Sequence, residues 1–256
     1  MQNKVIIMGN GLNGSYSRLE ITPAKKFFLN QYNNGKKNVV SLKLNSVFVE
    51  NHTIVIGQEK EIKVVEHLFS TLYGLSIFNV KIDLFGKELP FFDGSSQDFV
   101  KSLMPYKLDR NIETIKLNRE IFIQDKASYI HYKPCDKGLF IEMELSHPFI
   151  KKQHIALTIN RENYIKEIAP ARTFVFTDET DLRLKNLPPY GIGITKNGIF
   201  SNKPLRFPDE PVRHKILDFL GDIYILQKKL AGRITAYNTS HILNLKFVSK
   251  LMNSLK

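Results

Sequence analysis

A pair of residues that could bind a metal ion lies in the last fifth of the chain. His214 and Asp218 are four positions apart, so on a helix both side chains would project from one face, one turn apart. An imidazole nitrogen and a carboxylate oxygen placed in this way suit a divalent ion such as Zn²⁺. Asp222 continues the same face one turn further on. Taken alone, this segment still favours a surface His–Asp pair that binds no metal.

A second candidate pair is Glu66 and His67, in another stretch of helical hydrophobic spacing. Adjacent residues of a helix diverge by about 100°. His67 could therefore bind a metal while Glu66 points past it toward a water molecule, which is the position that a general base needs. Adjacent Glu and His residues also occur by chance, and this pair alone favours that explanation.

Two further residues could complete a hydrolytic site. His241 follows the polar run Asn-Thr-Ser and is expected to open a helix. A carboxylate such as Asp222 would favour its protonated form, which could act as a general acid or stabilise an oxyanion. Thr173 lies just after a turn, where its hydroxyl could polarise a carbonyl group. The alternatives are a solvent-exposed histidine and a structural threonine.

The composition limits which kinds of site the chain can build. It has 256 residues, with 43% hydrophobic and 24% charged residues, as in ordinary globular proteins. Cys135 is the only cysteine, which excludes an internal disulfide and a thiolate-rich zinc site and fits a reducing compartment. The start lacks a signal-peptide pattern and no apolar run approaches the roughly 20 residues that span a bilayer. We therefore expect a cytoplasmic location.

The formal net charge of +12 indicates an anionic partner without identifying it. Lys and Arg residues are scattered along the chain rather than concentrated in one basic helix. We therefore expect no nucleic-acid partner. A small acidic substrate, or transient contact with an anionic membrane surface, fits the charge equally well.

The elements that would position these residues occur in a similar order in the two halves of the chain. In the first half the hydrophobic patterns predict strands at 17–22, 39–44, 53–56 and 79–84, and helices at 61–75 and 97–104. In the second half they predict strands at 120–124, 129–133, 139–145 and 154–159, and helices at 162–168, 211–229 and 241–251. The helix at 211–229 begins with Pro211 after the acidic Asp209 and Glu210.

This order predicts two α+β domains of related design, at residues 1–108 and 114–256. A Gly-, Pro- and Asn-rich stretch at about 177–209 is predicted to be an insertion in the second domain. The similarity of the halves is one of element order and not of sequence identity, so an internal duplication is a hypothesis.

Taken together, the motifs resemble one family, the zinc-dependent UDP-3-O-acyl-N-acetylglucosamine deacetylases of lipid A biosynthesis. The similar segments follow the order of that family and span nearly the whole chain. They are Val-Glu-His-Leu (65–68) with Tyr-Gly-Leu (73–75), Phe-Asp-Gly-Ser (92–95), Ser-His-Pro (146–148), Ala-Arg-Thr-Phe (171–174), Val-Arg-His-Lys (212–215) with Asp-Phe-Leu-Gly-Asp (218–222), and Thr-Ser-His (239–241) with Leu-Asn (243–244).

The resemblance implies a role for each matching residue. His67, His214 and Asp218 would be the zinc ligands, with a fourth coordination position left open, and Fe²⁺ is the alternative metal. Glu66 would be the general base. The resemblance further implies that His241, oriented by Asp222, stabilises the oxyanion and assists departure of the amine. It implies that Thr173 hydrogen-bonds the tetrahedral intermediate. It also implies that Lys215 lies near anionic groups of the substrate and that Phe174 packs beside the sugar.

At the level of the whole protein, the resemblance implies an enzyme of the lipopolysaccharide pathway of Gram-negative bacteria. It would remove acetate from UDP-3-O-(3-hydroxyacyl)-N-acetylglucosamine. The diphosphate of this substrate is anionic, so the positive net charge of the protein would attract it. The implied fold is a two-layer α+β sandwich of two similar domains with zinc at their interface, and we expect a monomer.

Two departures from the family pattern leave other functions open. Asn13 stands where the family usually has His, and the stretch at 177–209 looks short beside typical members. The first alternative is therefore a divergent paralogue that deacetylates another N-acetyl sugar. The second is a non-catalytic module that binds anions through its basic surface.

Overall fold

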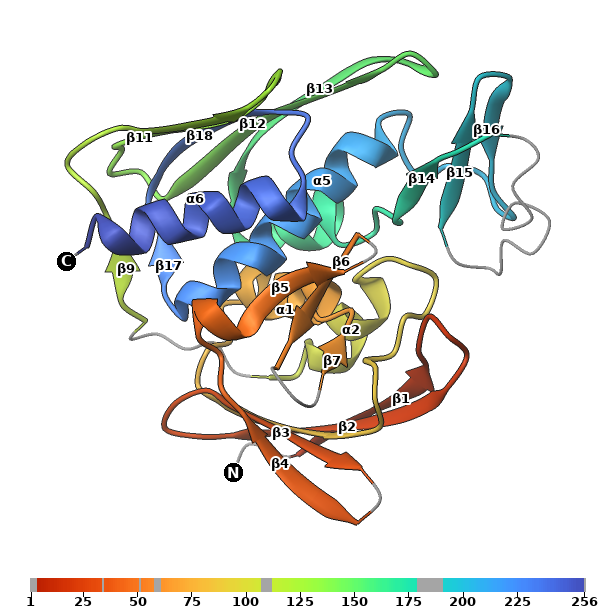
Figure 1. The fold of residues 1–256 in the computed structure, drawn as a ribbon, viewed down its shortest axis with the longest axis vertical. Helices are drawn as coiled ribbons and strands as arrows, with labels where there is room; N and C mark the ends of the chain where they lie inside the picture. The colour runs from red at the N-terminus through yellow and green to blue at the C-terminus, as the bar shows by residue number, and fades with distance from the viewer. Residues whose placement is uncertain are drawn as a thin grey trace.

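The computed structural model describes residues 4–33, 35–50, 52–57, 61–106, 112–178 and 191–255. Two five-stranded sheets form the outer layers and the main helices lie between them (Figure 1). The predicted α+β class is confirmed. Among the described residues, no helix is long and apolar enough to cross a membrane.

The first sheet belongs to the N-terminal half. Its strand order is β1 (Val5–Asn10), β2 (Tyr16–Pro23), β8 (Val80–Phe85), β3 (Phe28–Asn33) and β4 (Lys36–Val40). Along β2, Ser17, Leu19 and Ile21 are buried while the residues between them are not. This period of two directs one face of the sheet toward the helices.

The second sheet repeats this topology in the C-terminal half. Its order is β10 (Ile121–Asp125), β11 (Ser128–Lys133), β18 (Gly232–Tyr237), β12 (Leu139–His147) and β13 (Ile150–Ile159). In each half the last strand lies between two antiparallel hairpins, antiparallel to one of them and parallel to the other. The similarity of element order predicted from the sequence therefore extends to strand pairing.

Two helices in each half fill the space between the sheets. They are α1 (Glu66–Gly74) and α2 (Gln97–Leu103) in the first half, and α5 (Glu210–Ile223) and α6 (His241–Asn253) in the second. Every residue of α1 is buried, as expected for a helix surrounded by other elements. α1 packs directly against α5, so helices of the two halves meet at the centre of the molecule.

Short additional elements lie beside these layers. Residues between β4 and α1 form η1 (Leu44–Ser46) and a small sheet of β5 (Val47–Glu50), β6 (Thr53–Ile56) and β7 (Ile62–Lys63). Residues between β13 and α5 form the short helices α3 (Arg161–Asn163) and η2 (Tyr164–Ile168) and a small sheet of β14 (Phe174–Phe176), β15 (Ile192–Thr195) and β16 (Gly198–Phe200). A two-stranded pair joins β9 (Thr114–Ile115) to β17 (Lys229–Leu230).

Several predicted boundaries are wrong, most clearly those of two helices and one strand. The helix predicted at 61–75 begins only at Glu66, because Ile62 and Lys63 pair with β6 and Val64 has a positive φ of 62°. The helix predicted at 211–229 ends at Ile223 and continues only as the turn η3 (Tyr224–Leu226), after which Gln227 adopts the left-handed region. Of the strand predicted at 39–44, only Val39 and Val40 belong to β4, and Leu44 already opens η1.

The proposed domain limits and the insertion lie partly outside the described residues. The boundary between 1–108 and 114–256 falls on 107–111, and residues 179–190 of the stretch at 177–209 are likewise outside them. The described part of that stretch contains β15 and β16.

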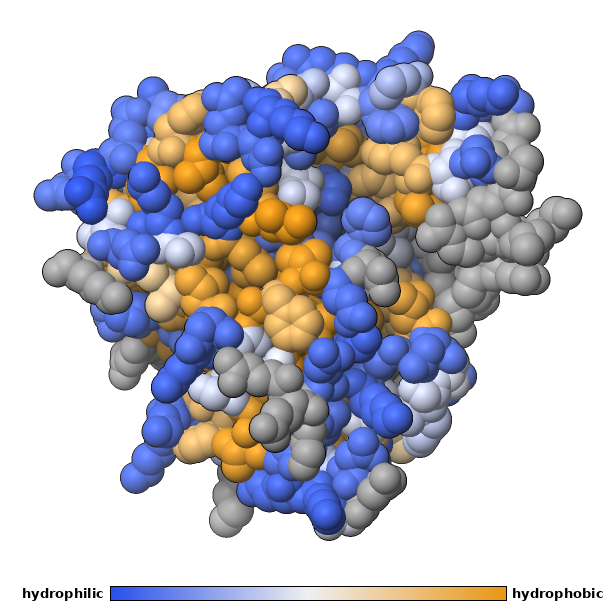
Figure 2. All heavy atoms as spheres, viewed as in Figure 1, coloured by the Kyte–Doolittle hydropathy of each residue, from blue (hydrophilic) through white to orange (hydrophobic). Residues whose placement is uncertain are grey.

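The helices leave part of their apolar surface uncovered where the two sheets face each other. Figure 2 shows hydrophobic residues gathered over α6 and β5 in this band, with hydrophilic residues around it. Phe48 of β5 and Ile242 of α6 are among the exposed large hydrophobic side chains. His241 stands directly beside Ile242 at the start of α6.

Candidate metal centre and its acid–base residues

The three predicted metal ligands come together where α1 meets α5. His67 lies in the first turn of α1, and His214 and Asp218 lie one turn apart on α5. One ligand atom from each residue lies within 4.8 Å of the others, and all three residues are buried. Small side-chain shifts would bring these atoms to a single ion, whose bonds to nitrogen and oxygen are about 2.0–2.2 Å long.

Hydrogen bonds of His214 leave one of its ring nitrogens facing this cluster. Nδ1 lies 3.1 Å from the carbonyl oxygen of Ala171, and it must donate there because a carbonyl oxygen only accepts. Nε2 lies 3.2 Å from Oδ1 of Asp218. The tautomer with the proton on Nδ1 therefore presents the lone pair of Nε2 to the position between the three side chains.

His67 is held by ring contacts. Its ring stacks on Phe91 at a centroid distance of 5.4 Å and meets the His214 ring edge-on at 5.2 Å. Its buried Nδ1 has no hydrogen-bond partner among the described residues. Burial lowers the pKa of His67 to about 3. His67 is therefore neutral, which is the form that binds a metal, and the cluster fits a divalent ion.

Glu66 precedes His67 and is also buried, with only 3% of its surface exposed. Its Oε2 accepts a hydrogen bond of 3.2 Å from the backbone N–H of Ile54, in β6. Burial raises the pKa of Glu66 to about 7, although the nearby charge of His241 opposes the shift. A carboxylate with a pKa near neutrality is suited to general-base catalysis.

His241 and Asp222 form a buried ion pair beside the cluster. Nδ1 of His241 lies 2.8 Å from Oδ2 and 3.1 Å from Oδ1 of Asp222, and Asn244 donates to the same carboxylate at 2.7 Å. Burial lowers the pKa of His241, but the carboxylates of Asp222 and Asp218 outweigh it and raise the pKa to about 9. His241 thus carries a proton at neutral pH, and its Nε2 lies 4.0 Å from Oδ1 of Asp218.

Lys215 and Phe174 flank the cluster on the side where α5 begins. Nζ of Lys215 lies 3.4 Å from Oδ2 of Asp218 and 5.4 Å from the centroid of the Phe174 ring. The Phe174 ring lies edge-on to His214 at 6.3 Å. Residues from α1, α5, α6 and β14 therefore surround one position.

Thr173 immediately precedes Phe174 and lies in a tightly packed turn. Its backbone N–H donates to the carbonyl of Gly94 at 2.7 Å. A Cβ on Gly94, whose φ is +80°, would come within 2.8 Å of the Thr173 methyl group. A glycine is thus required at Gly94 for both its backbone conformation and this close approach.

Asn13 lies in an exposed turn after β1. Its backbone N–H donates to Oε2 of Glu88 at 3.2 Å, and its side-chain oxygen accepts from the N–H of Ser15 at 2.8 Å. The side chain is therefore occupied in stabilising its own turn.

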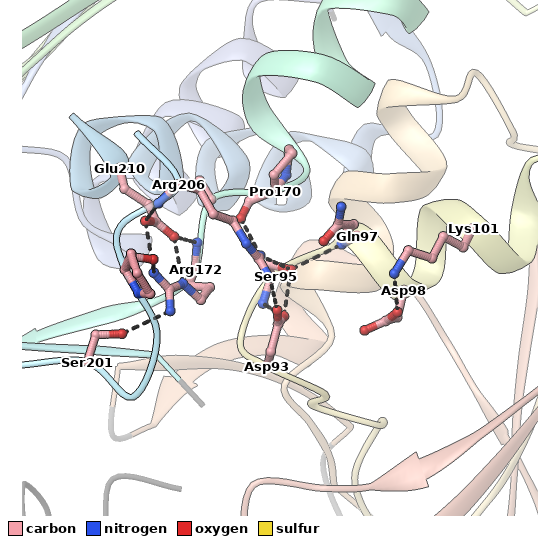
Figure 3. Close-up of polar contacts among 12 residues, drawn as sticks. Asp93, Ser95, Gln97, Asp98, Lys101, Pro170, Arg172, Ser201, Arg206 and Glu210 are labelled. Carbon is pink, nitrogen blue, oxygen red and sulfur yellow. Dashed lines mark hydrogen bonds and ion pairs between the residues drawn. The ribbon is translucent and has the colours of Figure 1, made fainter. Parts of the chain in front are cut away.

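A second polar network, which we did not predict from the sequence, lies behind the candidate metal ligands. Figure 3 shows Arg172 and Arg206 converging on Glu210, while Arg206 also reaches Asp93 and Ser95. Arg172 and Glu210 are only 2% and 0% exposed. Two signals could have pointed to them, namely the Arg in the Ala-Arg-Thr-Phe segment and the Glu directly before a helix-opening Pro.

Fold and site together define a class of protein. Two α+β halves of equal topology meet at helices that carry two histidines and an aspartate, beside a buried glutamate and a protonated histidine. This combination of donor atoms and acid–base groups is characteristic of metal-dependent hydrolases with a catalytic site.

Comparison with known proteins identifies the family. A sequence model of UDP-3-O-acyl N-acetylglycosamine deacetylase matches residues 1–253, and the chain belongs to this family of metalloenzymes. Proteins named UDP-3-O-acyl-N-acetylglucosamine deacetylase are similar along most of their length. The one from Aquifex aeolicus is 30% identical over 100% of this chain and 93% of its own. The one from Wolinella succinogenes is 35% identical over 83% and 75% respectively, and the one from Thermodesulfovibrio yellowstonii is 29% identical over 99% and 91%.

Proposed function

We propose that this protein hydrolyses the acetamide of UDP-3-O-(3-hydroxyacyl)-N-acetylglucosamine to release acetate and the free amine, in lipid A biosynthesis. The observation that carries the proposal is the meeting of His67, His214 and Asp218 within 4.8 Å, with a base and an acid beside them. Family membership supports the reaction and its substrate class.

In this proposal His67, His214 and Asp218 hold Zn²⁺, with Fe²⁺ as the alternative metal. The bound ion would act as a Lewis acid on the substrate carbonyl and lower the pKa of water at the site. Two nitrogen ligands and one oxygen ligand match the donor set of catalytic zinc sites, which leave a fourth position open.

The side chains around the cluster supply the proton transfers. Glu66 takes a proton from the attacking water, because its raised pKa balances basicity against the fraction that is ionised near neutral pH. Thr173 donates a hydrogen bond to the oxyanion that forms on the former carbonyl oxygen. His241, protonated because of Asp222, stabilises the developing negative charge and donates a proton to the amide nitrogen, which is otherwise a poor leaving group. The C–N bond then breaks.

Substrate binding is assigned to charged and aromatic side chains next to the ligands. In this proposal Lys215 attracts anionic groups of the substrate and Phe174 packs against the sugar, which the closeness of Nζ of Lys215 to the Phe174 ring supports. The formal net charge of +12 favours encounter with a diphosphate. We predict a cytoplasmic monomer that makes at most transient contact with a membrane surface and binds no nucleic acid. Light scattering and cell fractionation would test these points.

The deciding experiment combines metal content with activity for the wild type and Glu66→Ala. We expect about one zinc per chain in both proteins, and loss of about 100-fold to 10,000-fold in kcat for the variant, which is the usual contribution of a general base. Glu162→Ala is the control, since this exposed carboxylate lies in the short helix α3 and pairs with Lys166. Native protein without stoichiometric metal would refute the proposal.

Asn13 supports a second candidate, a deacetylase of another N-acetyl sugar. Members of the family usually have His at this position. The Asn13 side chain cannot transfer a proton, and it accepts a hydrogen bond within its own turn. Rates with acylated and non-acylated UDP-N-acetylglucosamine separate the two candidates. A strong preference for the acylated substrate supports the first, whereas equal rates support the second.

A further inference from the structure

Glu210, which the proposed mechanism does not use, is a fully buried carboxylate at the first turn of α5. Its two oxygens accept four hydrogen bonds. Oε1 accepts from the backbone N–H and the Nε of Arg172 at 2.9 and 2.8 Å, and Oε2 accepts from Nη2 of Arg172 and the backbone N–H of Arg206 at 3.1 and 2.8 Å (Figure 3). Four donors match the acceptor capacity of one ionised carboxylate.

The backbone N–H of Arg172 and the carbonyl of Ala171 belong to the same planar peptide group. Glu210 binds the N–H end of this group at 2.9 Å. His214 binds its carbonyl end, through Nδ1, at 3.1 Å. A negative charge at the N–H end polarises the peptide and makes the carbonyl oxygen a better acceptor, which favours the Nδ1-protonated tautomer of His214.

We propose that Glu210 is a positioning residue of the metal centre, which acts on His214 through the Ala171–Arg172 peptide. Partners of this kind fix the ring orientation of a metal-binding histidine and raise its basicity. In most such sites the partner touches the imidazole directly, whereas here one peptide group stands between carboxylate and imidazole. The proposal rests on the assignment of His214 as a metal ligand.

The surrounding contacts hold the peptide in place. Nη1 of Arg172 donates to Ser201 at 2.9 Å and its Nη2 to the carbonyl of Pro204 at 3.0 Å. Nη1 of Arg206 donates to the carbonyl of Pro170 at 2.7 Å, one residue before Ala171. The segment that carries Ala171 and Arg172 is thereby fixed to residues 201–206, which lead into α5, the helix that carries His214.

A buried ion pair can also be retained for structure alone, so the test must measure metal binding rather than stability. Glu210→Gln removes the charge and keeps the shape. Asp209→Asn is the matched control, because Asp209 is the adjacent acidic residue at the same helix end, bonds Arg213 at 2.6 Å and makes no capping hydrogen bond.

The measurement is the Zn²⁺ dissociation constant of folded apoprotein, by competition with a chelator, well below each variant's melting temperature. We expect weaker binding by about 10-fold to 100-fold for Glu210→Gln and a change of less than about threefold for Asp209→Asn. A Glu210→Gln protein that melts lower but binds Zn²⁺ as the wild type does would overturn the proposal. Zinc binding is measured without substrate, so the outcome is independent of which sugar the enzyme deacetylates.

A measurement on the wild type covers the case in which Glu210→Gln does not fold. Zn²⁺ at His214 makes its Nδ1–H a stronger donor, and the effect should pass through the shared peptide to the Arg172 amide. We expect the Arg172 amide proton to shift downfield on Zn²⁺ addition by more than that of Arg206, which bonds the same carboxylate but not this peptide. Equal shifts of the two amides would contradict the proposed path.

Discussion

At the scale of single residues, burial and charge give similar side chains different protonation states. Glu66 and Asp218 are both buried carboxylates, yet the pKa of Glu66 is raised by burial, whereas the histidine charges hold the pKa of Asp218 well below its usual range against the same effect. His67 and His241 are both buried imidazoles, and only His241 has a carboxylate partner that keeps it protonated. The acid, base and ligand roles that we propose therefore follow from the neighbours of each group.

The pair of His241 and Asp222 predicts the alkaline side of the pH profile. The acid form of His241 is lost as pH rises through its pKa of about 9. Asp222→Asn removes the carboxylate that raises this pKa, while the burial that lowers it remains. We expect the alkaline limb of kcat/KM to move below about pH 7, with a loss of about 30-fold at pH 8. Asp125→Asn, at an exposed carboxylate paired with Lys246, is the control and should leave the alkaline limb in place. An alkaline limb that does not move in Asp222→Asn would show that Asp222 does not keep His241 protonated.

At the scale of elements, the site depends on how closely α5 approaches the start of α1. Gly221 lies against the backbone of Glu66, and a Cβ placed there would come within 2.3 Å of the Glu66 carbonyl oxygen. Only a residue without a side chain allows this contact. The distance between the proposed base on α1 and the candidate ligands on α5 is thus set by one glycine, three residues after Asp218.

Gly221→Ala is expected to lower both stability and activity. Alanine stabilises a helix by about 1 kcal/mol relative to glycine, but overpacking against the backbone costs about 1–3 kcal/mol. Because the added Cβ would lie 2.3 Å from a carbonyl oxygen, we expect a cost at the upper end of this range. We expect a melting temperature lower by about 2–8 °C and a reduced kcat, because Glu66 is displaced. Gly138→Asn is the control, as a Cβ at Gly138 meets open space. A Gly221→Ala protein of higher stability and full activity would show that the helices can separate freely.

At the scale of the whole molecule, the two halves are related by topology and share one site. Each contains two hairpins, a helix, a strand inserted between the hairpins and a second helix, and each has a small extra sheet before its first long helix. His67 comes from the first long helix of one half, and His214 and Asp218 come from the corresponding helix of the other. This arrangement supports the proposals of two related domains and of an ancestral duplication.

Because the candidate ligands come from both halves, metal binding should stabilise the molecule as a unit. At a free Zn²⁺ concentration 100 times the dissociation constant, about 2.7 kcal/mol is added to the free energy of unfolding. We expect a single calorimetric transition that rises by about 5–10 °C from chelated to zinc-loaded protein. His67→Ala should abolish most of this rise although Asp218 and His214 remain. Two transitions, of which zinc shifts only one, would contradict the shared site.

The sequence by itself determined the residue types of the site and the class of the fold. The spacing of His214 and Asp218 on one helix face, the adjacent Glu66 and His67, and the helix start at His241 follow from periodicities of local structure, which the chain encodes over a few residues. Only the tertiary structure decided that α1 begins after Val64 and that Gly221 sets the separation of the two central helices. It also decided that Glu210 reaches His214 through a peptide group. The contacts of Gly221 and Glu210 join residues that are tens to more than a hundred positions apart in the chain, and no local pattern specifies such contacts.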